Sequence, residues 1–482
     1  MAEETKESLK QQTKKGLYWS FFNQFANYGM QFCVGIVMAR LLSPSDYGIT
    51  ALPTVFISIA WIFQNGGLSD ALVRKVDLKE TDISTAFFYS IAVGIFLYLC
   101  LFFFSDLIAN FYDTPILSIL LKVTSLTFLW GPLNVAQNII LNRTLKFKVQ
   151  AKISFITRVC SACVGLILAY MGYGLWSLVV SNVLSSLFTV ILSWYYVRWL
   201  PKTGWSIESF KYLWKYGNKI MISSLIDTAY FNITPLFIAK FYNPESLGLY
   251  NRAHGYAMMP SQNITGVIQN VTFPVLSRMQ NDNNVLSRNY RRMLKSTAFI
   301  IFPIMMMLSA LAHPLVITLV TAKWEACVIL LQIICFSMMW YPIHSINLNL
   351  LKVKGRSDLI LRLEIIKKIV GVSILAITLP HGLIVFCCGS VVSSLIALVI
   401  NTYYTGKLIN VGYFKQMRDL LPIVLLGLVM FAIIHLSNCL ISNMLLQIIC
   451  GGIFGAIVYI GGAVLFKFSE LDDVKYMLKR KS

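Results

Sequence analysis

The stretch Ala39–Ile49 reads Ala-Arg-Leu-Leu-Ser-Pro-Ser-Asp-Tyr-Gly-Ile, and Ala239–Leu249 repeats it as Ala-Lys-Phe-Tyr-Asn-Pro-Glu-Ser-Leu-Gly-Leu. The alanine, proline and glycine keep their register, and each copy separates one long apolar segment from the next. Ser43 or Asn243 can cap a helix, the following proline suits the first helical position, and an acid in the first turn favours the helix dipole. Two such junctions in two halves of one chain indicate an internal duplication.

The composition is that of an integral membrane protein. The chain of 482 residues is 57% hydrophobic and only 13% charged, with a mean hydropathy of +0.68. A soluble domain carries about 25% charged residues. The net charge of +20 raises the question of where the basic residues lie.

Apolar segments long enough to span a bilayer, about 20 residues each, recur along the whole chain. We predict fourteen transmembrane helices, which makes this an all-α membrane protein. They are 17–40, 47–69, 84–104, 117–140, 153–171, 174–197, 219–240, 252–275, 296–319, 327–350, 362–380, 383–405, 420–438 and 442–466.

The basic residues test this topology. With the N-terminus in the cytoplasm, 35 of the 41 lysines and arginines fall in cytoplasmic connections and tails. The outer side receives Arg40, Lys240, Arg252 and Lys323. This asymmetry follows the positive-inside rule and predicts that both termini are cytoplasmic. It explains the net charge without a nucleic-acid partner, and it favours contact with anionic membrane lipids.

The duplication predicts two similar bundles. Helices 1 and 7 are an even number of crossings apart, so the halves have the same orientation, as in a parallel repeat. We therefore divide the chain into a first six-helix bundle (1–205), a second six-helix bundle (206–410), and two additional helices with a cytoplasmic tail (411–482).

Polar and charged side chains within apolar segments mark the candidate site, because such groups usually face a cavity or a partner. The segments 17–40 and 252–275 are the most polar. The substrate-binding candidates are Asn23, Asn27, Arg40, Arg158, Lys240, Arg252, His254 and Gln262, and Asp227 is the candidate for ion coupling. The alternative for Arg40 and Lys240 is that they snorkel to the outer membrane interface.

No pattern in the sequence indicates an enzyme. We find no phosphate-binding glycine loop, no metal-ligand cluster, and no nucleophile with a supporting base. Cys160-x-x-Cys163 lacks a second pair and a nearby histidine, which favours ordinary apolar helix residues. We therefore expect no metal and no cofactor, with coupling to H⁺ or Na⁺.

Several motifs resemble the Wzx-type polysaccharide exporters, or O-antigen flippases, of the multidrug/oligosaccharidyl-lipid/polysaccharide superfamily. They are Ala39–Ile49, Leu145-Lys-Phe-Lys148, Gly172-Tyr-Gly-Leu-Trp176 and Gly355-Arg-Ser-Asp358. The resemblance implies two six-helix bundles in a V around a central cavity, with two extra C-terminal helices.

The resemblance also implies a function. It is the movement of undecaprenyl-diphosphate-linked oligosaccharides across the bacterial inner membrane, for O-antigen, capsule or exopolysaccharide synthesis. A polysaccharide polymerase and a chain-length regulator are the implied protein partners. Cations for a diphosphate and amides for sugar hydroxyls fit the candidate residues.

Two alternatives stay open at this point. A drug/cation antiporter of the same superfamily needs buried carboxylates, and Asp227 is the one clear candidate. A non-transporting membrane scaffold in envelope assembly would seal its polar helix faces against each other and leave no wet path.

Overall fold

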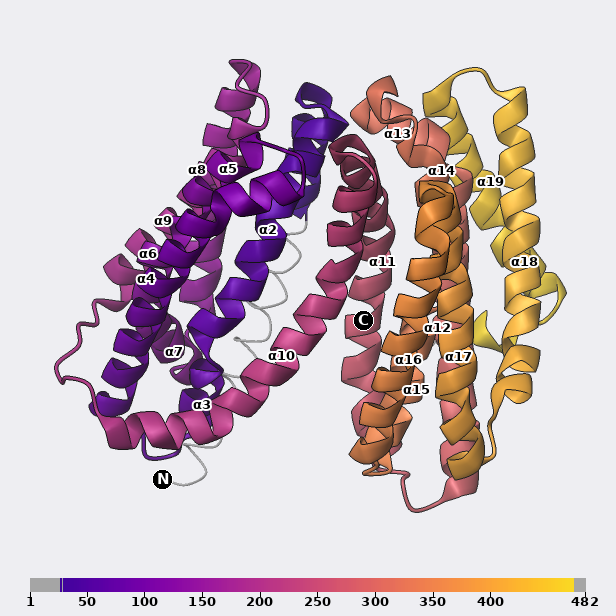
Figure 1. Ribbon diagram of the computed structural model, residues 1–482. Helices are drawn as coiled ribbons and strands as arrows, with labels where there is room; N and C mark the ends of the chain where they lie inside the picture. Colours follow the sequence, from indigo (N-terminus) through magenta and orange to yellow (C-terminus); the bar gives the residue numbers. More distant parts are fainter. Residues whose placement is uncertain (1–26, 28, 472–482) are drawn as a thin grey trace. The chain divides into compact units, whose positions relative to one another are not determined.

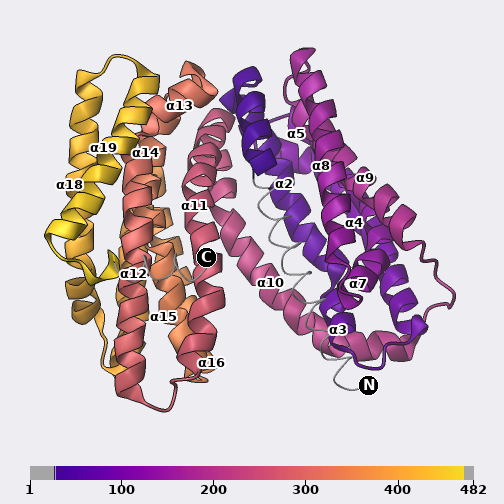
Figure 2. The ribbon, with the colours of Figure 1, turned by 180° about the vertical axis from the view of Figure 1, so that it is seen from behind.

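The computed structural model describes residues 27 and 29–471, and every regular element in this part of the chain is a helix. The chain forms two compact units that meet in sequence at Gly248 and Leu249. Figures 1 and 2 show the helices from opposite sides. The all-helical fold class is therefore confirmed.

The first unit contains the early helices and the start of α11. Its described elements begin with a helical segment at Gly29–Leu41. There follow α2 (Pro44–Asn65), α3 (Leu68–Arg74), α4 (Glu80–Phe111), α5 (Ile116–Ser125), α6 (Thr127–Trp130), η1 (Gly131–Asn134), α7 (Val135–Arg143), α8 (Phe147–Tyr170), α9 (Trp176–Val197), α10 (Ile207–Phe241) and the first turn of α11 (Pro244–Ser277).

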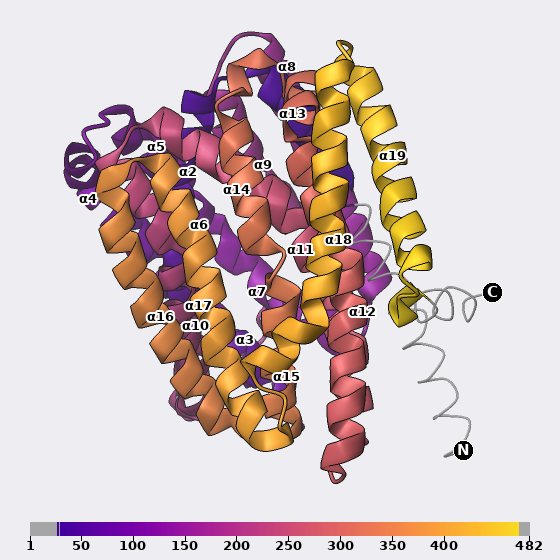
Figure 3. The ribbon, with the colours of Figure 1, turned by 90° about the vertical axis from the view of Figure 1, so that its right-hand side faces the viewer.

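The second unit contains the rest of α11 and all later helices. These are α12 (Asn283–Ala310), α13 (Ala312–Val320), η2 (Ala322–Trp324), α14 (Cys327–Met338), α15 (Tyr341–Val353), α16 (Ser357–Thr378), η3 (Leu379–His381), α17 (Leu383–Ile409), α18 (Tyr413–Leu440) and α19 (Met444–Leu465). Figure 3 shows α18 and α19 side by side, with α12 next to α18.

Both repeat junctions form the helix starts that the sequence predicts. Ser43 caps α2 in a reciprocal capping box, because its hydroxyl accepts from the amide of Asp46 at 3.2 Å while its own amide donates to the Asp46 carboxylate at 2.9 Å. At the start of α11, the amide of Ser246 donates to Asn243 Oδ1 at 2.7 Å. Each helix therefore begins at its proline with a side-chain cap, as expected.

Eleven helices of the described residues are long and apolar enough to cross a membrane. The described part of each of the fourteen predicted segments is mostly helical, and only residues 27 and 29–40 of the first segment are described. Besides that first segment, α11 and α16 are the predicted crossings missing from the eleven. The protein is a multi-pass membrane protein, and the count of fourteen crossings stays a prediction.

The predicted repeat boundary at 205/206 differs from the boundary between the compact units at 248/249. The boundary at 205/206 comes from sequence duplication, whereas the units reflect which helices pack together. Because α10 packs on α2, α3 and α4, it belongs to the first compact unit. The division into 1–205, 206–410 and 411–482, which was inferred from the internal duplication, stays a prediction.

The last two helices are fastened to the second unit by polar contacts. Arg291 of α12 binds Asp419 of α18 through two hydrogen bonds of 2.6 Å, and Lys295 pairs with Glu470 at 2.6 Å. Both acids are buried. Gly451 and Gly455 of α19 pack against Leu311 and Ile434 inside the unit. These helices are therefore an integral part of their unit.

Candidate functional site

Lys240 belongs to the first unit and lies in the last turn of α10. Its ammonium forms an ion pair with Asp113 at 3.1 Å, donates to the carbonyl of Phe111, and lies 4.7 Å from the centroid of the Phe111 ring. Asp113, in the turn between α4 and α5, keeps 83% of its side-chain exposure. Such a solvent-screened pair is weak, so an anionic ligand could compete with Asp113 for Lys240. Arg40, the first-repeat counterpart, is exposed at the end of its helix.

Arg252 lies near two aromatic rings of the second unit. The central carbon of its guanidinium is 5.2 Å from the ring centroid of Tyr256, which lies one turn further along α11. The same carbon is 5.4 Å from the ring centroid of Trp324. Trp324 belongs to η2 and is completely buried. A guanidinium held over two rings is attracted by their π faces and loses rotational freedom. Such an arrangement would hold the positive charge of Arg252 in one orientation toward a ligand.

His254 does not share this environment. It stacks on Tyr250 with a centroid distance of 5.7 Å and an interplanar angle of 23°. Residues two apart on an α-helix are separated by about 200° around its axis. Arg252 and His254 therefore extend from different sides of α11, although they are neighbours in sequence.

The polar residues of α11 divide between a packed side and an exposed side. On the packed side, the Ser261 hydroxyl donates to the Met338 carbonyl at 2.7 Å, and Thr265 is buried. The Gln269 amide donates to Ser345, although Gln269 is an exposed residue. On the exposed side, Gln262 is followed by Gly266 and Phe273. Only part of the polar pattern in 252–275 is therefore available to a ligand.

The other candidates are scattered over the first unit. Asp227 is exposed in the middle of α10, and Arg158 is exposed on α8. Asn27 is half-buried, and Asn23 lies outside the described residues. No group of three potential metal-binding side chains occurs in the part of the chain that the structure describes.

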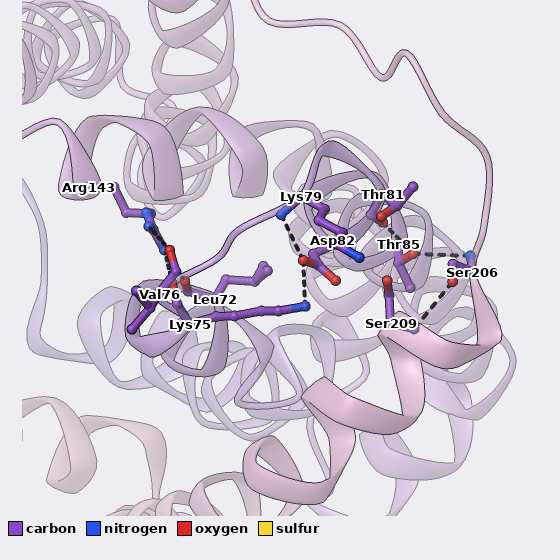
Figure 4. Close-up of polar contacts among 10 residues, drawn as sticks. All are labelled: Leu72, Lys75, Val76, Lys79, Thr81, Asp82, Thr85, Arg143, Ser206 and Ser209. Atoms are coloured by element: carbon purple, nitrogen blue, oxygen red, sulfur yellow. Dashed lines mark hydrogen bonds and ion pairs between the residues drawn. The ribbon is translucent and has the colours of Figure 1, made fainter.

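A buried ion pair near the start of α4 was not among the sequence-based candidates (Figure 4). Asp82 is fully buried, and its carboxylate accepts from the Lys75 ammonium at 2.7 Å and from the Lys79 amide at 2.9 Å. Nearby, the Arg143 guanidinium donates to the carbonyls of Leu72 and Lys75 at the end of α3, at 2.8 and 2.5 Å. The spacing Lys79-x-x-Asp82 is that of a capping pair, which is the signal that could have revealed it.

The fold resembles solved membrane transporters. The structure titled "Lipid II flippase MurJ, inward closed conformation" matches with a TM-score of 0.73 at 18% identity, over 93% of this chain and 99% of that one. A multidrug resistance MATE family transporter of the MOP superfamily, in its inward-facing conformation, matches with a TM-score of 0.58 at 15% identity, over 80% and 96%. The fold of this chain is thus similar to the folds of these two membrane proteins.

The sequence comparisons show the family. Residues 37–329 match the family described as "Polysaccharide biosynthesis protein", and the chain belongs to it. The succinoglycan biosynthesis transport protein ExoT of Rhizobium meliloti is 24% identical, over 95% of this chain and 94% of that protein. The teichuronic acid biosynthesis protein TuaB of Bacillus subtilis is 23% identical, over 88% and 90%.

A third relative has a name of the Wzx type. The lipopolysaccharide biosynthesis protein WzxC of Escherichia coli K12 is 23% identical, over 82% of this chain and 80% of that protein. The resemblance to Wzx-type polysaccharide exporters, inferred from short motifs, is therefore confirmed over most of the chain.

Proposed function

We propose that this protein is a flippase that moves undecaprenyl-diphosphate-linked oligosaccharides from the cytoplasmic to the periplasmic face of the bacterial inner membrane. The match to the polysaccharide biosynthesis family across residues 37–329 carries this proposal. Near-full-length similarity to a succinoglycan transport protein supports transport rather than sugar chemistry. The likeness to a lipid II flippase supports the fold that such transport uses.

The charge of the candidate residues agrees with an anionic substrate. Arg40, Arg158, Lys240 and Arg252 are cations, and Asp227 is the single acid among the candidates. A lipid diphosphate needs charge-assisted hydrogen bonds from such groups. A cation-coupled drug antiporter would need the opposite balance. The MATE-type fold likeness keeps that function as the second candidate.

The finer features of the proposal rest on the sequence. Fourteen crossings, two parallel six-helix bundles around a central cavity, cytoplasmic termini and an inner-membrane location follow from the charge asymmetry, the repeat and the resemblance. We propose Asp227 as the residue that couples transport to H⁺ or Na⁺. A polysaccharide polymerase and a chain-length regulator are the proposed protein partners.

The direct test is flipping in proteoliposomes. The purified full-length chain is reconstituted with a lipid-diphosphate-linked oligosaccharide from the host pathway, and a glycosidase that cannot cross the bilayer is added outside. Flipping makes the inner-leaflet glycan accessible, so we expect more than half of the glycan to be cleaved, against about half in empty vesicles. Equal cleavage in both preparations would contradict the flippase function and favour a scaffold.

The cellular test follows the same logic. Deletion of the gene should leave lipid-linked repeat units on the cytoplasmic face and reduce surface polysaccharide. Normal surface polysaccharide in a strain without a second flippase would contradict the proposal. Efflux of cationic drugs by the reconstituted protein, without movement of lipid-linked sugar, would favour the antiporter.

A further inference from the structure

The first part of α10, residues 207–217, is packed against first-unit helices (Figure 1). Leu213 is completely buried in a cluster with Leu68, Ala71 and Leu72 of α3. Burying a leucine side chain stabilises such an interface. The segment is therefore docked by its apolar side, although the repeat pattern assigns it to the second half.

Aromatic rings extend this contact to α4. Tyr89 of α4 lies 5.8 Å from the ring centroid of Phe210 and 5.9 Å from that of Trp214, and these two α10 rings stack at 5.5 Å. Aromatic groups at these separations attract one another beyond their apolar burial. Residues 207–217 of α10 therefore pack on α4 as well as on α3.

Two cations at the end of α3 lie over rings of α10. The Arg74 guanidinium is 4.6 Å from the ring centroid of Tyr216, and the Lys75 ammonium is 4.6 Å from the ring centroid of Tyr212. Lys75 also holds the buried Asp82 at the start of α4. One lysine therefore joins α3, α4 and α10.

The N-terminus of α10 is fixed by hydrogen bonds. The amide of Ser206, its N-cap residue, donates to Thr85 Oγ1 of α4 at 3.2 Å. Figure 4 shows Ser206 and Ser209 beside Thr85 and Asp82. Just before it, the Thr203 hydroxyl donates to Ser84 of α4 at 3.1 Å. The entry of the chain into α10 is thus tied to the same helix.

Two glycines allow the backbones to touch. A Cβ atom at Gly67 would lie 2.2 Å from the carbonyl oxygen of Gly217, which is far inside van der Waals contact. Gly67 also has a φ of +66°, a conformation that favours glycine. Backbone contact at this point leaves little room for α10 to slide or tilt on α3.

We propose that residues 207–217 of α10 stay docked on α3 and α4 throughout transport, so that the first helix of the second repeat works as part of the first unit. Any conformational change of this helix then occurs beyond Gly217. The inference rests on the proposed flippase function for the existence of a transport cycle, and on the contacts above for the part that stays fixed.

The test ties the docked segment covalently to the first unit. In a chain whose ten native cysteines are replaced, Thr85→Cys and Ser206→Cys are introduced together and oxidised to a disulfide. A second pair, Arg74→Cys and Tyr216→Cys, is bridged by a short bifunctional thiol reagent, so that the test survives if one pair folds poorly. Mass spectrometry gives the linked fraction, and single-cysteine variants treated in the same way are the controls.

We expect at least 90% linkage with flipping within twofold of the untethered parent. Tethered protein that loses flipping and regains it when the disulfide is reduced would overturn the inference, because α10 would then have to leave α3 and α4. An untethered parent that does not flip lipid-linked sugar would instead overturn the proposed function, and the inference with it.

Discussion

Gly48 and Gly248 lie in close contact, although 200 positions separate them in the chain. A Cβ atom at Gly48 would lie 1.6 Å from the carbonyl oxygen of Pro244, and one at Gly248 would lie 1.9 Å from that of Pro44. The contact is reciprocal, so the two junction motifs that repeat in sequence also meet in space. Since both residues belong to the first unit, the start of α11 is packed there on the start of α2.

The glycine contact predicts a severe effect of added methyl groups. Gly48→Ala and Gly248→Ala each place a methyl against backbone, which cannot move aside as a flexible side chain can. Overpacking costs about 1–3 kcal/mol in an ordinary core and more where backbone must shift. We expect a large fall in the thermal midpoint of the detergent-solubilised protein, measured by size-exclusion chromatography after heating.

The matched control is Gly255→Ala in α11. No atom lies within 4 Å of a Cβ at that position, and alanine is the better helix former by about 0.8–1 kcal/mol. This variant should be unchanged or slightly more stable. Equal midpoints for Gly48→Ala, Gly248→Ala and Gly255→Ala would show that the junctions do not pack as described.

The buried pair Lys75–Asp82 predicts a second loss of stability. Asp82→Asn removes the charge that Lys75 faces across 2.7 Å. Removing one partner of a buried pair costs about 3–5 kcal/mol, and the 18% exposure of Lys75 places the effect near the lower end. A double replacement, Lys75→Met with Asp82→Leu, should recover much of the loss, because neither charge is then left unpaired.

The comparison for this pair is Arg356–Asp358, which forms two hydrogen bonds of 2.9 and 2.8 Å but is about half exposed. Asp358→Asn should therefore leave the thermal midpoint unchanged, since water screens the pair. If Asp82→Asn also left the thermal midpoint unchanged, the Lys75–Asp82 pair at the start of α4 would not contribute to the stability of the protein.

Local patterns in the sequence were sufficient for much of the fold. The caps at Ser43 and Asn243 depend on neighbouring residues only, so the helix starts could be predicted from the junction motifs. The apolar segments could be located for the same reason. The packing of Gly217 on Gly67 depends on residues 150 positions apart, and no short pattern reports such a contact.

The candidate site was harder to predict for a related reason. Arg252 and His254 are two residues apart in sequence, but their partners, Trp324 and Tyr250, come from different places in the second unit. Gln269 looked like Gln262 in the sequence, yet it is bonded to Ser345. Polarity within an apolar segment marks a buried or functional group without telling which of the two it is.

The charge asymmetry predicts the topology, which reporter fusions can measure. Cytoplasmic lysines and arginines should leave the fusion sites near them inside the cell. Fusions at Asp113, Gly172 and Asn443 should read periplasmic, and fusions at Lys148, Lys211, Lys354 and Ser482 should read cytoplasmic. A periplasmic signal at Ser482 would be incompatible with fourteen crossings that start in the cytoplasm.

The setting of Arg252 predicts how export depends on it. We expect Arg252 to bind the diphosphate of the substrate while Tyr256 and Trp324 hold its guanidinium. One charge-assisted hydrogen bond contributes about 1.5–3 kcal/mol, and each 1.4 kcal/mol is about tenfold in affinity. Arg252→Ala should therefore weaken substrate binding about ten- to a hundredfold. Arg252→Lys should keep part of the activity, because the charge remains while the two-pronged geometry is lost.

The measurement is flipping in proteoliposomes at matched protein levels, with Lys323→Ala as the control. Lys323 is another cation of the predicted outer side and adjoins Trp324 in η2, so its removal tests charge without removing the guanidinium that lies near the two rings. We expect Lys323→Ala to flip at nearly the parent rate. If Arg252→Ala and Lys323→Ala both matched the parent, Arg252 would be an interface anchor, because a residue that binds the diphosphate cannot be lost without cost to flipping. If both failed equally, the general positive charge of this region would matter, and the specific role of Arg252 would be wrong.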